Sequence, residues 1–359
     1  MFANTFKNKT ILLTGHTGFK GSWASLWLHK MGANVVGVSD KELTVPSNYS
    51  SIGLKNIITD IRLDIRNLDD IKKAIIDISP DYLFHFAAQS LVSISYKDPI
   101  QTFTKNTIGT LNILESIREY NKRMTAIFVT SDKVYENVEW VWGYRENDKL
   151  GGNDPYSSSK GMAELVIKSY SNSFFKNSDI KIGIGRAGNV IGGGDWSVDR
   201  IVPDCLKAWY SDNEVVIRNP KSTRPWQFVL EPISGYFLMA EYLSKGKIKS
   251  GEAFNFGPNS ADNFRVIDLL NEMKKYYKNG KIVLNNSKSN KIKEAGLLKL
   301  NCDKALSELE WKSNLNFNKT IEMTMQWYNY YYNNLGQSMY EFSKDQIDEY
   351  VNIALSQKI

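Results

Sequence analysis

Short apolar runs alternate with longer amphipathic stretches along the first half of the chain, and this rhythm constrains the fold more than any other feature of the sequence. The apolar runs cover residues 10–14, 34–38, 60–64, 81–87, 126–130 and 181–186, and the amphipathic stretches cover 21–31, 68–78, 104–120 and 158–174. Short apolar runs are typical of buried strands, and the longer stretches repeat their apolar positions with the period of a helix. We therefore expect a Rossmann-type doubly wound parallel sheet of the α/β class, with ligands bound outside the carboxyl ends of its strands.

The rhythm breaks after about Asn189, where Gly192, Gly193 and Gly194 form a loop and mixed elements follow up to about Asn334. We expect a smaller mixed α/β substrate-binding domain that packs directly on the first domain, because no low-complexity linker separates the two. The expected division is a dinucleotide-binding domain over 1–190, to which a segment of about 229–256 returns, an interleaved substrate-binding domain over 191–335, and a C-terminal helical extension over 336–359.

Composition narrows the classes of function. No apolar run approaches the ~20 residues of a membrane-spanning helix, and the N-terminus lacks the apolar segment of a signal peptide. The cysteines, Cys205 and Cys302, have no metal-ligand spacing, so we expect neither a disulfide framework nor a metal site, and a cytoplasmic location fits. The net charge is +6, but no basic run is interleaved with aromatic residues, so we expect anionic small molecules rather than nucleic acid as partners.

A glycine-rich loop follows the first apolar run directly. It has the pattern GxxGxxG and consists of Gly15, His16, Thr17, Gly18, Phe19, Lys20 and Gly21. Glycine is needed where the backbone turns tightly and approaches a pyrophosphate, and the start of the next helix offers free N–H groups to the phosphates. We expect this loop to bind a dinucleotide. Asp40, after the second run, can bind a ribose 2′-hydroxyl and would favour NAD over NADP, although an aspartate in a surface turn needs no ligand.

Tyr156 and Lys160 form a Tyr-x-x-x-Lys unit at the start of a predicted helix. The spacing places both side chains on one helix face. An unperturbed phenol titrates at about 10, and a nearby ammonium together with a positively charged nicotinamide favours the phenolate. The pair is therefore predicted to remove a hydroxyl proton during hydride transfer, and Lys160 could also hold the nicotinamide ribose.

Longer segments make the sequence similar to a known family. They are TGHTGFKGSWASLWL from Thr14, FHFAAQSLVSISYKDP from Phe84, VTSDKVYENVEWVWGYREND from Val129, LGGNDPYSSSKGMAEL from Leu150, RAGNVIGGGDW from Arg186 and IRNPKSTRPWQFVLEP from Ile217. Over roughly its first 260 residues the chain resembles the extended short-chain dehydrogenase/reductases of the NAD-dependent epimerase/dehydratase family, and within them the nucleotide-sugar 4,6-dehydratases. The resemblance implies a bound NAD that is reduced and reoxidised within one turnover, and a CDP-linked glucose as substrate.

The implied reaction oxidises C4, eliminates water across C5 and C6, and returns the hydride to C6. By resemblance, Tyr156 is the base for the C4 hydroxyl, Ser131 assists it, and Asp132 is the acid for the C6 hydroxyl. Lys133 takes the place of a glutamate in dTDP-glucose relatives and would act at C5, which requires a neutral amine. As a solvated turn pair, Asp132 and Lys133 would have no such role.

Further residues correspond to the cofactor and substrate sites of relatives. On the cofactor side these are Asp64, Ile65, Ala87, Ala88, Gln89, Asn106 and Thr130; on the substrate side they are Gln89, Ser131, Asn189, Arg200, Arg218, Arg224, Trp226 and Glu231. Guanidinium groups suit the diphosphate oxygens. Core packing would explain the alanines and Trp226 equally well, and a surface position would explain Asn106. Phe228 stands where relatives commonly have histidine, which weakens the choice of CDP.

Two other functions remain open at this point. A sugar-nucleotide 4-epimerase would keep the glycine loop and the Tyr156–Lys160 pair but would not need Asp132 or Lys133. A non-catalytic dinucleotide-binding regulator would need no catalytic pair at all. Relatives pair through helices such as the one after Tyr156, so we also expect a homodimer or homotetramer.

Overall fold

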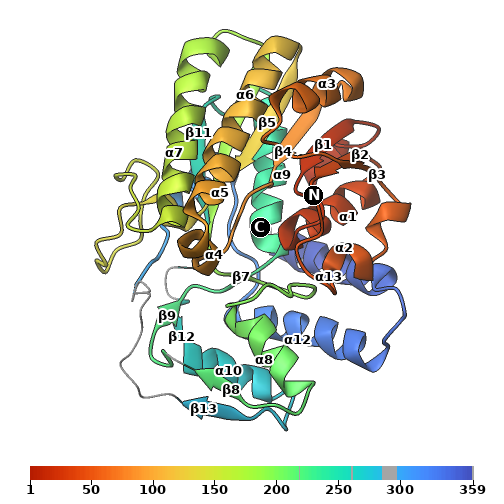
Figure 1. The fold of residues 1–359 in the computed structure, drawn as a ribbon, viewed down its shortest axis with the longest axis vertical. Helices are drawn as coiled ribbons and strands as arrows, with labels where there is room; N and C mark the ends of the chain where they lie inside the picture. Colours follow the sequence, from red (N-terminus) through yellow and green to blue (C-terminus); the bar gives the residue numbers. More distant parts are fainter. Residues whose placement is uncertain (218, 260–261, 285–296, 358–359) are drawn as a thin grey trace.

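One seven-stranded parallel sheet forms the centre of the computed structural model, which describes residues 1–217, 219–259, 262–284 and 297–357 (Figure 1). The strands follow the order β11-β6-β5-β4-β1-β2-β3, and all neighbours are parallel. They are β1 (Thr10–Thr14), β2 (Asn34–Ser39), β3 (Thr59–Arg62), β4 (Tyr82–His85), β5 (Met124–Val129), β6 (Ile180–Ala187) and β11 (Glu252–Phe256). The strand order reverses between β1 and β4, so a crevice is expected at their carboxyl ends.

Helices cover both faces of this sheet, and alternate strand residues divide between two cores. Leu12 belongs to the core under α3 (Leu68–Ile78), α6 (Gly109–Tyr120) and α7 (Pro155–Tyr170). Its neighbours Ile11 and Leu13 belong to the larger core, which includes residues of α1 (Phe19–Lys30) and α9 (Leu230–Ser244). The apolar runs of the sequence are therefore strands because both of their faces are covered by helices.

Shorter elements connect these layers. They are α2 (Asn48–Ser51), α4 (Val92–Lys97), α5 (Pro99–Phe103), the one-turn π-helix η3 (Thr104–Ile108), which leads into α6, and the short 3₁₀ turn η4 (Asp132–Val134) after β5. The amphipathic stretch 104–120 thus begins as a wider turn and continues as α6. Buried Asn106 lies in this π-helix and hydrogen-bonds outside it.

A smaller lobe lies below the sheet in Figure 1. It contains α8 (Ile201–Trp209), α10 (Val266–Lys274), α12 (Phe317–Asn333), and two small sheets that pair β8 (Val215–Ile217) with β13 (Ile282–Leu284) and β9 (Thr223–Arg224) with β12 (Phe264–Arg265). Between the lobes, β7 (Val190–Ile191) pairs with β10 (Gln227–Phe228). After β10 the chain runs through α9 to β11, both of which belong to the large sheet and its covering layer, and α11 (Asp303–Leu309) follows later.

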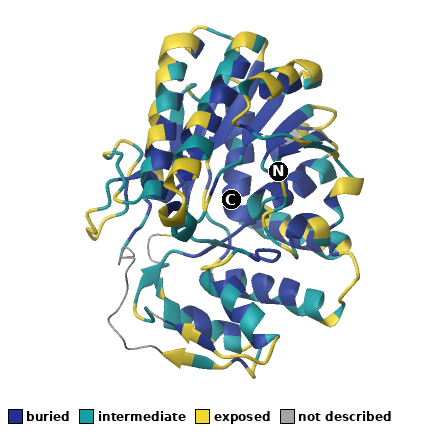
Figure 2. Cartoon of the chain, viewed as in Figure 1, coloured by how far each residue is buried: buried dark blue, intermediate teal, exposed yellow. Residues whose placement is uncertain are grey.

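The C-terminal helix α13 (Tyr340–Ser356) packs against the larger lobe rather than extending from it. The rings of Tyr350 and Trp27 on α1 are 5.7 Å apart and meet edge to face. Figure 2 shows the inner side of this region buried. Among the helices of the described residues, none combines the length and apolarity needed to cross a membrane.

Candidate active site

A cleft of about 1100 Å³, here called the main cleft, lies at the carboxyl ends of the sheet strands. Its walls come from the glycine loop, from the turns after β2, β3 and β4, from β5, η3 and α7, and from the segment before α8. The lining residues on which the site depends are Gly15, Thr17, Gly18, Phe19, Lys20, Gly21, Asp40, Ile65, Ala87, Ala88, Lys105, Thr130, Tyr156, Lys160, Asp195 and Arg200. Sequence positions far apart therefore meet at the edge where a doubly wound sheet binds ligands.

The glycine loop has no room for side chains at two of its glycines. Gly15 has φ +81°, and a Cβ there would lie 2.7 Å from the backbone nitrogen of Ala87. A Cβ on Gly21 would lie 2.1 Å from the carbonyl oxygen of Gly15. The backbone therefore turns tightly beneath the N-terminus of α1, and its N–H groups form a cradle suited to a phosphate.

His16 does not belong to this cradle, contrary to the expectation that it binds cofactor. Its side chain is fully buried, and its Nε2 lies 2.9 Å from Oδ1 of Asp60. The ring lies against Gly37, where a Cβ would come within 2.4 Å of it. Burial lowers the pKa of His16, with Asp60 acting in the opposite direction. His16 is therefore a neutral core residue that ties the loop to β3.

One end of the main cleft is lined by Asp40 and Lys105, whose Oδ2 and Nζ are 2.6 Å apart. Ile65 also lines the cleft. Asp64 does not: its carboxylate is held by Arg66, whose hydrogen bonds lower the pKa of Asp64. Asp64, expected among the cofactor-binding residues, is thus paired with Arg66 in the turn after β3, and its contact with the cofactor stays a prediction.

Gln89 and Asn106 support the cleft without lining it. The Asn106 side chain accepts from the Gln89 backbone nitrogen at 2.8 Å and donates to the Gln89 carbonyl at 2.9 Å. It also donates to the Ser159 hydroxyl at 2.9 Å on α7. Thus both residues, expected to touch cofactor, instead fasten the loop after β4 to the helix that carries Tyr156. Ala87, Ala88 and Thr130 do line the cleft, and the Thr130 hydroxyl donates to Glu164 at 2.6 Å.

Tyr156 and Lys160 lie in the first two turns of α7, and both line the main cleft. Burial raises the pKa of Tyr156 to about 12, and a hydrogen bond with Ser131 opposes that rise. Burial lowers the pKa of Lys160 to about 8. The phenol is therefore protonated in the ligand-free protein, and positive charge in the cleft is needed to make it a base at neutral pH.

Asp132 lies just after β5, in η4, and is buried. The Ser131 hydroxyl donates to its Oδ1 at 2.9 Å, and Asn189 Nδ2 lies 3.4 Å from its Oδ2. Gly188 makes this position possible, because a Cβ there would lie 1.9 Å from the Asp132 carboxylate. Ser131 thus connects Asp132 with Tyr156, because it also hydrogen-bonds with the phenol. Lys133 is only half-buried and lines neither the main cleft nor the cavity described next.

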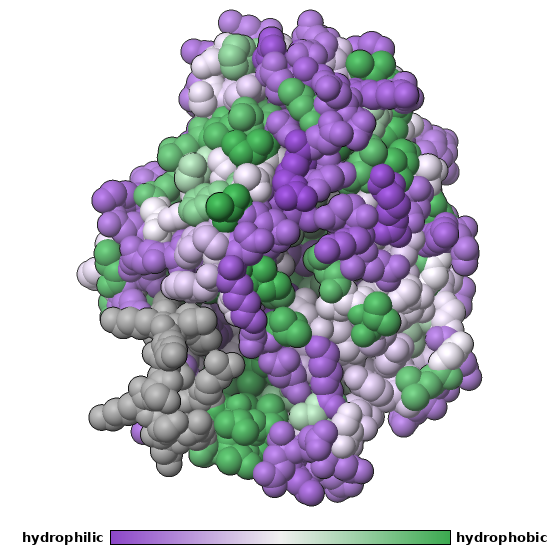
Figure 3. All heavy atoms as spheres, in the orientation of Figure 1, coloured by the Kyte–Doolittle hydropathy of each residue, from purple (hydrophilic) through white to green (hydrophobic). Residues whose placement is uncertain are grey.

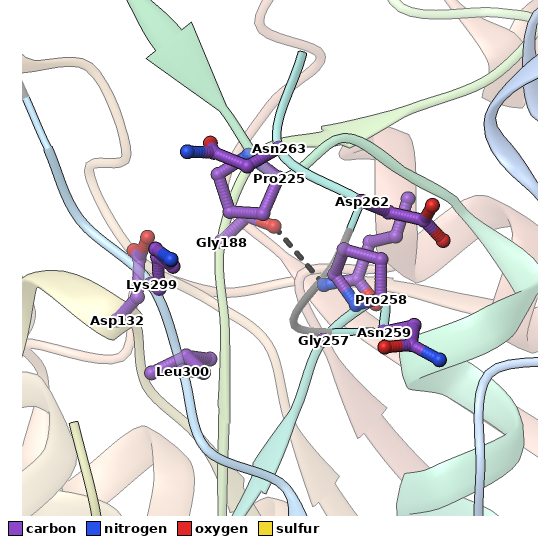
Figure 4. A pocket seen from close by; sticks show the side chains of 11 residues that line it. Asp132, Gly188, Pro225, Gly257, Pro258, Asn259, Asp262, Asn263, Lys299 and Leu300 are labelled. Carbon is purple, nitrogen blue, oxygen red and sulfur yellow. Dashed lines mark hydrogen bonds between the residues drawn. The ribbon is translucent and has the colours of Figure 1, made fainter. Parts of the chain in front are cut away.

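Asp132 also borders a second, much smaller cavity, shown in Figure 4. Its other walls come from Gly188, Pro225, Gln227, Gly257, Pro258, Asn259, Asp262, Asn263, Lys299 and Leu300. Among the residues that the structure describes, the buried amide oxygens of Gln227 and Asn263 have no hydrogen-bond partner. Two amide oxygens without a partner among the described residues, next to a carboxyl group, are suited to hydrogen bonds from a water molecule or a hydroxyl group.

Of the residues expected on the substrate side, Arg200 and Asn189 lie at the site, whereas Arg224 lies away from both cavities. Arg200, at the start of α8, lines the main cleft, and its Nη1 lies 2.8 Å from Oδ2 of Asp195. Asn189 touches Asp132. Arg224 lines neither cavity; it lies in β9 and donates to the Thr223 carbonyl at 2.8 Å. Arg218 lies outside the described residues.

Trp226, Phe228 and Glu231 belong to the core, which corrects two expected substrate contacts. Trp226 is buried with its ring 6.3 Å from that of Phe317. Glu231 is fully buried, and its Oε1 accepts from the backbone nitrogens of Asn314 and Leu315 at 2.8 and 2.7 Å. Burial raises the pKa of Glu231 to about 7. Phe228 packs edge to face on Trp23, so its difference from relatives changes the core and not the lining of either cavity.

Comparison with known proteins identifies the family of the chain. The model of the GDP-mannose 4,6 dehydratase family matches residues 12–324. The chain belongs to this family. A CDP-glucose 4,6-dehydratase of Salmonella typhimurium is 41% identical over 354 residues, which cover 97% of this chain and 98% of the relative.

Several solved structures share the fold of this chain. A UDP-glucose 4-epimerase from Thermotoga maritima, solved with UDP-glucose, has a TM-score of 0.78 at 22% identity and covers 89% of this chain and 99% of its own. A dTDP-glucose 4,6-dehydratase from Bacillus anthracis, in complex with NAD, has a TM-score of 0.73 at 21% identity and covers 90% and 97%. The expected Rossmann-type α/β fold is thus confirmed.

Sequence reasoning missed several residues that line the main cleft of this family member. They are Lys105, which lies within a stretch that shows only the pattern of a helix, and Asp195, Trp196 and Ser197, which follow the three glycines of the loop after β7. The order Gly-Gly-Gly-Asp-Trp could have indicated Asp195, Trp196 and Ser197, because a tight glycine turn can place the side chains that follow it close to a ligand. Within the described ranges, no group of three or more His, Cys, Asp or Glu side chains could hold a metal ion.

Proposed function

We propose that the protein is an NAD-dependent 4,6-dehydratase that converts CDP-glucose to CDP-4-keto-6-deoxyglucose. The observation that carries the proposal is that Ser131 links buried Asp132 to Tyr156: its hydroxyl donates to Asp132 Oδ1 at 2.9 Å, and it also hydrogen-bonds with the Tyr156 phenol. An acid close to the C4 base is what dehydration requires and epimerisation does not. The nucleotide and sugar follow from the relative of 41% identity, whose full length the chain matches.

The main cleft fits a dinucleotide. Its loop leaves no room for a Cβ at Gly15 or Gly21, so the backbone can approach a pyrophosphate. Asp40 lines the same cleft, and a carboxylate that binds a ribose 2′-hydroxyl favours NAD over NADP. When bound, NAD accepts a hydride from C4 and returns it to C6.

The protein groups would supply the proton transfers. Tyr156, assisted by Ser131 and by the charge of Lys160, takes the proton of the C4 hydroxyl. Asp132 gives a proton to the C6 oxygen, which leaves as water while a double bond forms between C5 and C6. In keeping with the family resemblance, we assign to Lys133 both the removal of the C5 proton and its return to C5 once hydride has been added to C6. Lys133 is half-buried and lines neither cavity, so Lys133→Ala is the direct test of this assignment.

The proposed protein works in the cytoplasm as a homodimer or homotetramer, without nucleic acid. Apolar side chains on the outer surfaces of η3 and α7 support the assembly: Ile108, Met162 and Leu165 are 44%, 46% and 58% exposed. Figure 3 shows apolar surface on the upper lobe, which contains these helices. Exposed apolar groups of this kind are typical of interfaces between subunits.

The purified protein, loaded with NAD, should be incubated separately with CDP-, dTDP-, UDP- and GDP-linked hexoses. We expect mass spectrometry to show the loss of one water from CDP-glucose. A product of unchanged mass with inverted C4 would identify an epimerase instead. Binding of NAD with no turnover of any sugar nucleotide would favour the non-catalytic regulator.

A further inference from the structure

Lys20 is a charged side chain of the main cleft to which the reaction above gives no role. It is the second residue of α1 and lines the cleft together with Tyr156, Lys160 and Arg200. The charges that act on its ammonium are those of Arg200, Lys160 and Asp132, all of which belong to the catalytic end. The backbone of the glycine loop therefore forms the phosphate cradle, while this side chain serves the catalytic end.

The protein does not neutralise Lys20. Among the described residues, none forms a hydrogen bond or an ion pair with its amine. Asp195 is already paired with Arg200 at 2.8 Å, Asp40 is paired with Lys105, and Asp132 faces Ser131 and Asn189. Burial and the repulsion from Arg200 and Lys160 lower the pKa of Lys20 to about 7. A cationic group held without an acceptor is unfavourable unless a ligand brings negative charge.

The geometry of a sugar nucleotide indicates which negative charge this is. When C4 of the hexose lies at Tyr156, the phosphate on C1 is one sugar ring away. Arg200 and Lys20 line the same cleft as Tyr156, and the charge of Arg200 acts on both Tyr156 and Lys20. Both cations therefore line the cleft in which the phosphate that carries the sugar has to lie.

We propose that Lys20, together with Arg200, binds the sugar-bearing phosphate of the substrate. This inference rests on the proposed function, because it takes the ligand to be a nucleoside diphosphate sugar. It changes the expected role of Lys20, whose backbone serves the cofactor loop but whose side chain serves the substrate.

The test compares binding of CDP and CMP to the NAD-loaded protein, since only CDP carries the second phosphate. Calorimetry should show that wild-type protein binds CDP more tightly than CMP. In Lys20→Met the CDP affinity should fall about ten- to a hundredfold toward that of CMP, as expected for the loss of a charge-assisted hydrogen bond, while CMP binding stays unchanged. Lys20→Arg should restore most of the preference. Lys30→Met, at the other end of the same helix, is the matched control and should behave as wild type.

A proton readout separates this role from a structural one. Above pH 7, CDP binding to wild-type protein should take up a proton, because the bound phosphate raises the pKa of Lys20, and Lys20→Met should lose this uptake. The proposal is overturned if Lys20→Met weakens NAD binding with the CDP-to-CMP ratio unchanged, if it lowers only kcat, or if it changes nothing. Failure of the proposed function would look different: wild-type protein would itself show no turnover of CDP-glucose or no preference for CDP.

Discussion

Asp40 Oδ2 and Lys105 Nζ lie 2.6 Å apart across one end of the main cleft, so the carboxylate expected to select NAD is itself held by a lysine from η3. This relationship makes cofactor preference depend on both residues. The acid repels a 2′-phosphate, whereas the lysine alone would attract one.

Asp40→Ala should therefore shift the preference from NAD toward NADP. We expect the ratio of the NAD and NADP affinities to change by about tenfold or more, because the variant removes the repulsion between Asp40 and the 2′-phosphate and leaves the Lys105 ammonium free to attract that phosphate. Titration of cofactor-free protein with each dinucleotide measures this ratio. Asp348→Ala, which breaks the ion pair of Asp348 with Lys30 on the outer surface, should leave it unchanged. An unaltered ratio in Asp40→Ala would show that Asp40 does not read the ribose.

Lys133→Ala tests the C5 assignment. If Lys133 removes the C5 proton, the variant should still oxidise C4 and accumulate reduced nicotinamide, while release of water slows by about 10²- to 10⁴-fold. Stopped-flow absorbance and product mass measure the two steps. Asp132→Asn should give the same signature, because it removes the acid of the same elimination. Wild-type turnover by Lys133→Ala would exclude Lys133 from the mechanism.

The pH dependence of kcat/KM should report Lys160. Its pKa in the folded protein is about 8, below the ordinary lysine value, because it is buried. The ammonium is present below that pH and disappears as the pH rises through about 8, so the field that favours the Tyr156 phenolate is lost and kcat/KM should fall. Lys160→Arg, which stays charged, should move this alkaline limb upward. If the alkaline limb of kcat/KM stays at the same pH in Lys160→Arg, the titration of Lys160 does not cause it.

The buried Arg186–Glu164 pair should dominate the stability of the region beneath the site. Both side chains are fully buried, Arg186 Nε donates to Glu164 Oε1 at 2.8 Å, and Glu164 also accepts from Thr130. Glu164→Gln should lower the free energy of unfolding in urea by about 3–5 kcal/mol, because it leaves a guanidinium buried without its counter-ion. Lys149→Met breaks the exposed pair with Glu136 and should cost less than about 1 kcal/mol. Equal losses in the two variants would contradict this reading.

The strands and the α/β class of the sheet could be predicted because their signals are local. A strand such as β5 is buried at all six positions, so its apolar run is visible without knowledge of its neighbours. The Tyr156–Lys160 spacing is equally local, because one helix carries both residues.

The direction of a side chain within a loop is not a local property. His16 and Lys20 stand in the same glycine pattern, but Gly37 on β2 leaves a space that takes the His16 ring into the core, while Lys20 lines the cleft. Glu231 and Trp226 were expected at the substrate because polar and aromatic residues in that segment suit a ligand. Their true partners, Leu315 and Phe317, lie more than eighty residues later in the chain, and no pattern in the sequence indicates that pairing.

The narrow space between Gly188 and Asp132 has a consequence for how this family can diverge. Any side chain at position 188 would occupy the place of the Asp132 carboxylate. A descendant that abandons elimination could lose the acid first and only then accept a larger residue at 188, whereas the reverse order would pass through a damaged site. Substitutions at these two positions should therefore be linked, because any side chain at 188 requires the Asp132 carboxylate to turn away from its present place or to be replaced.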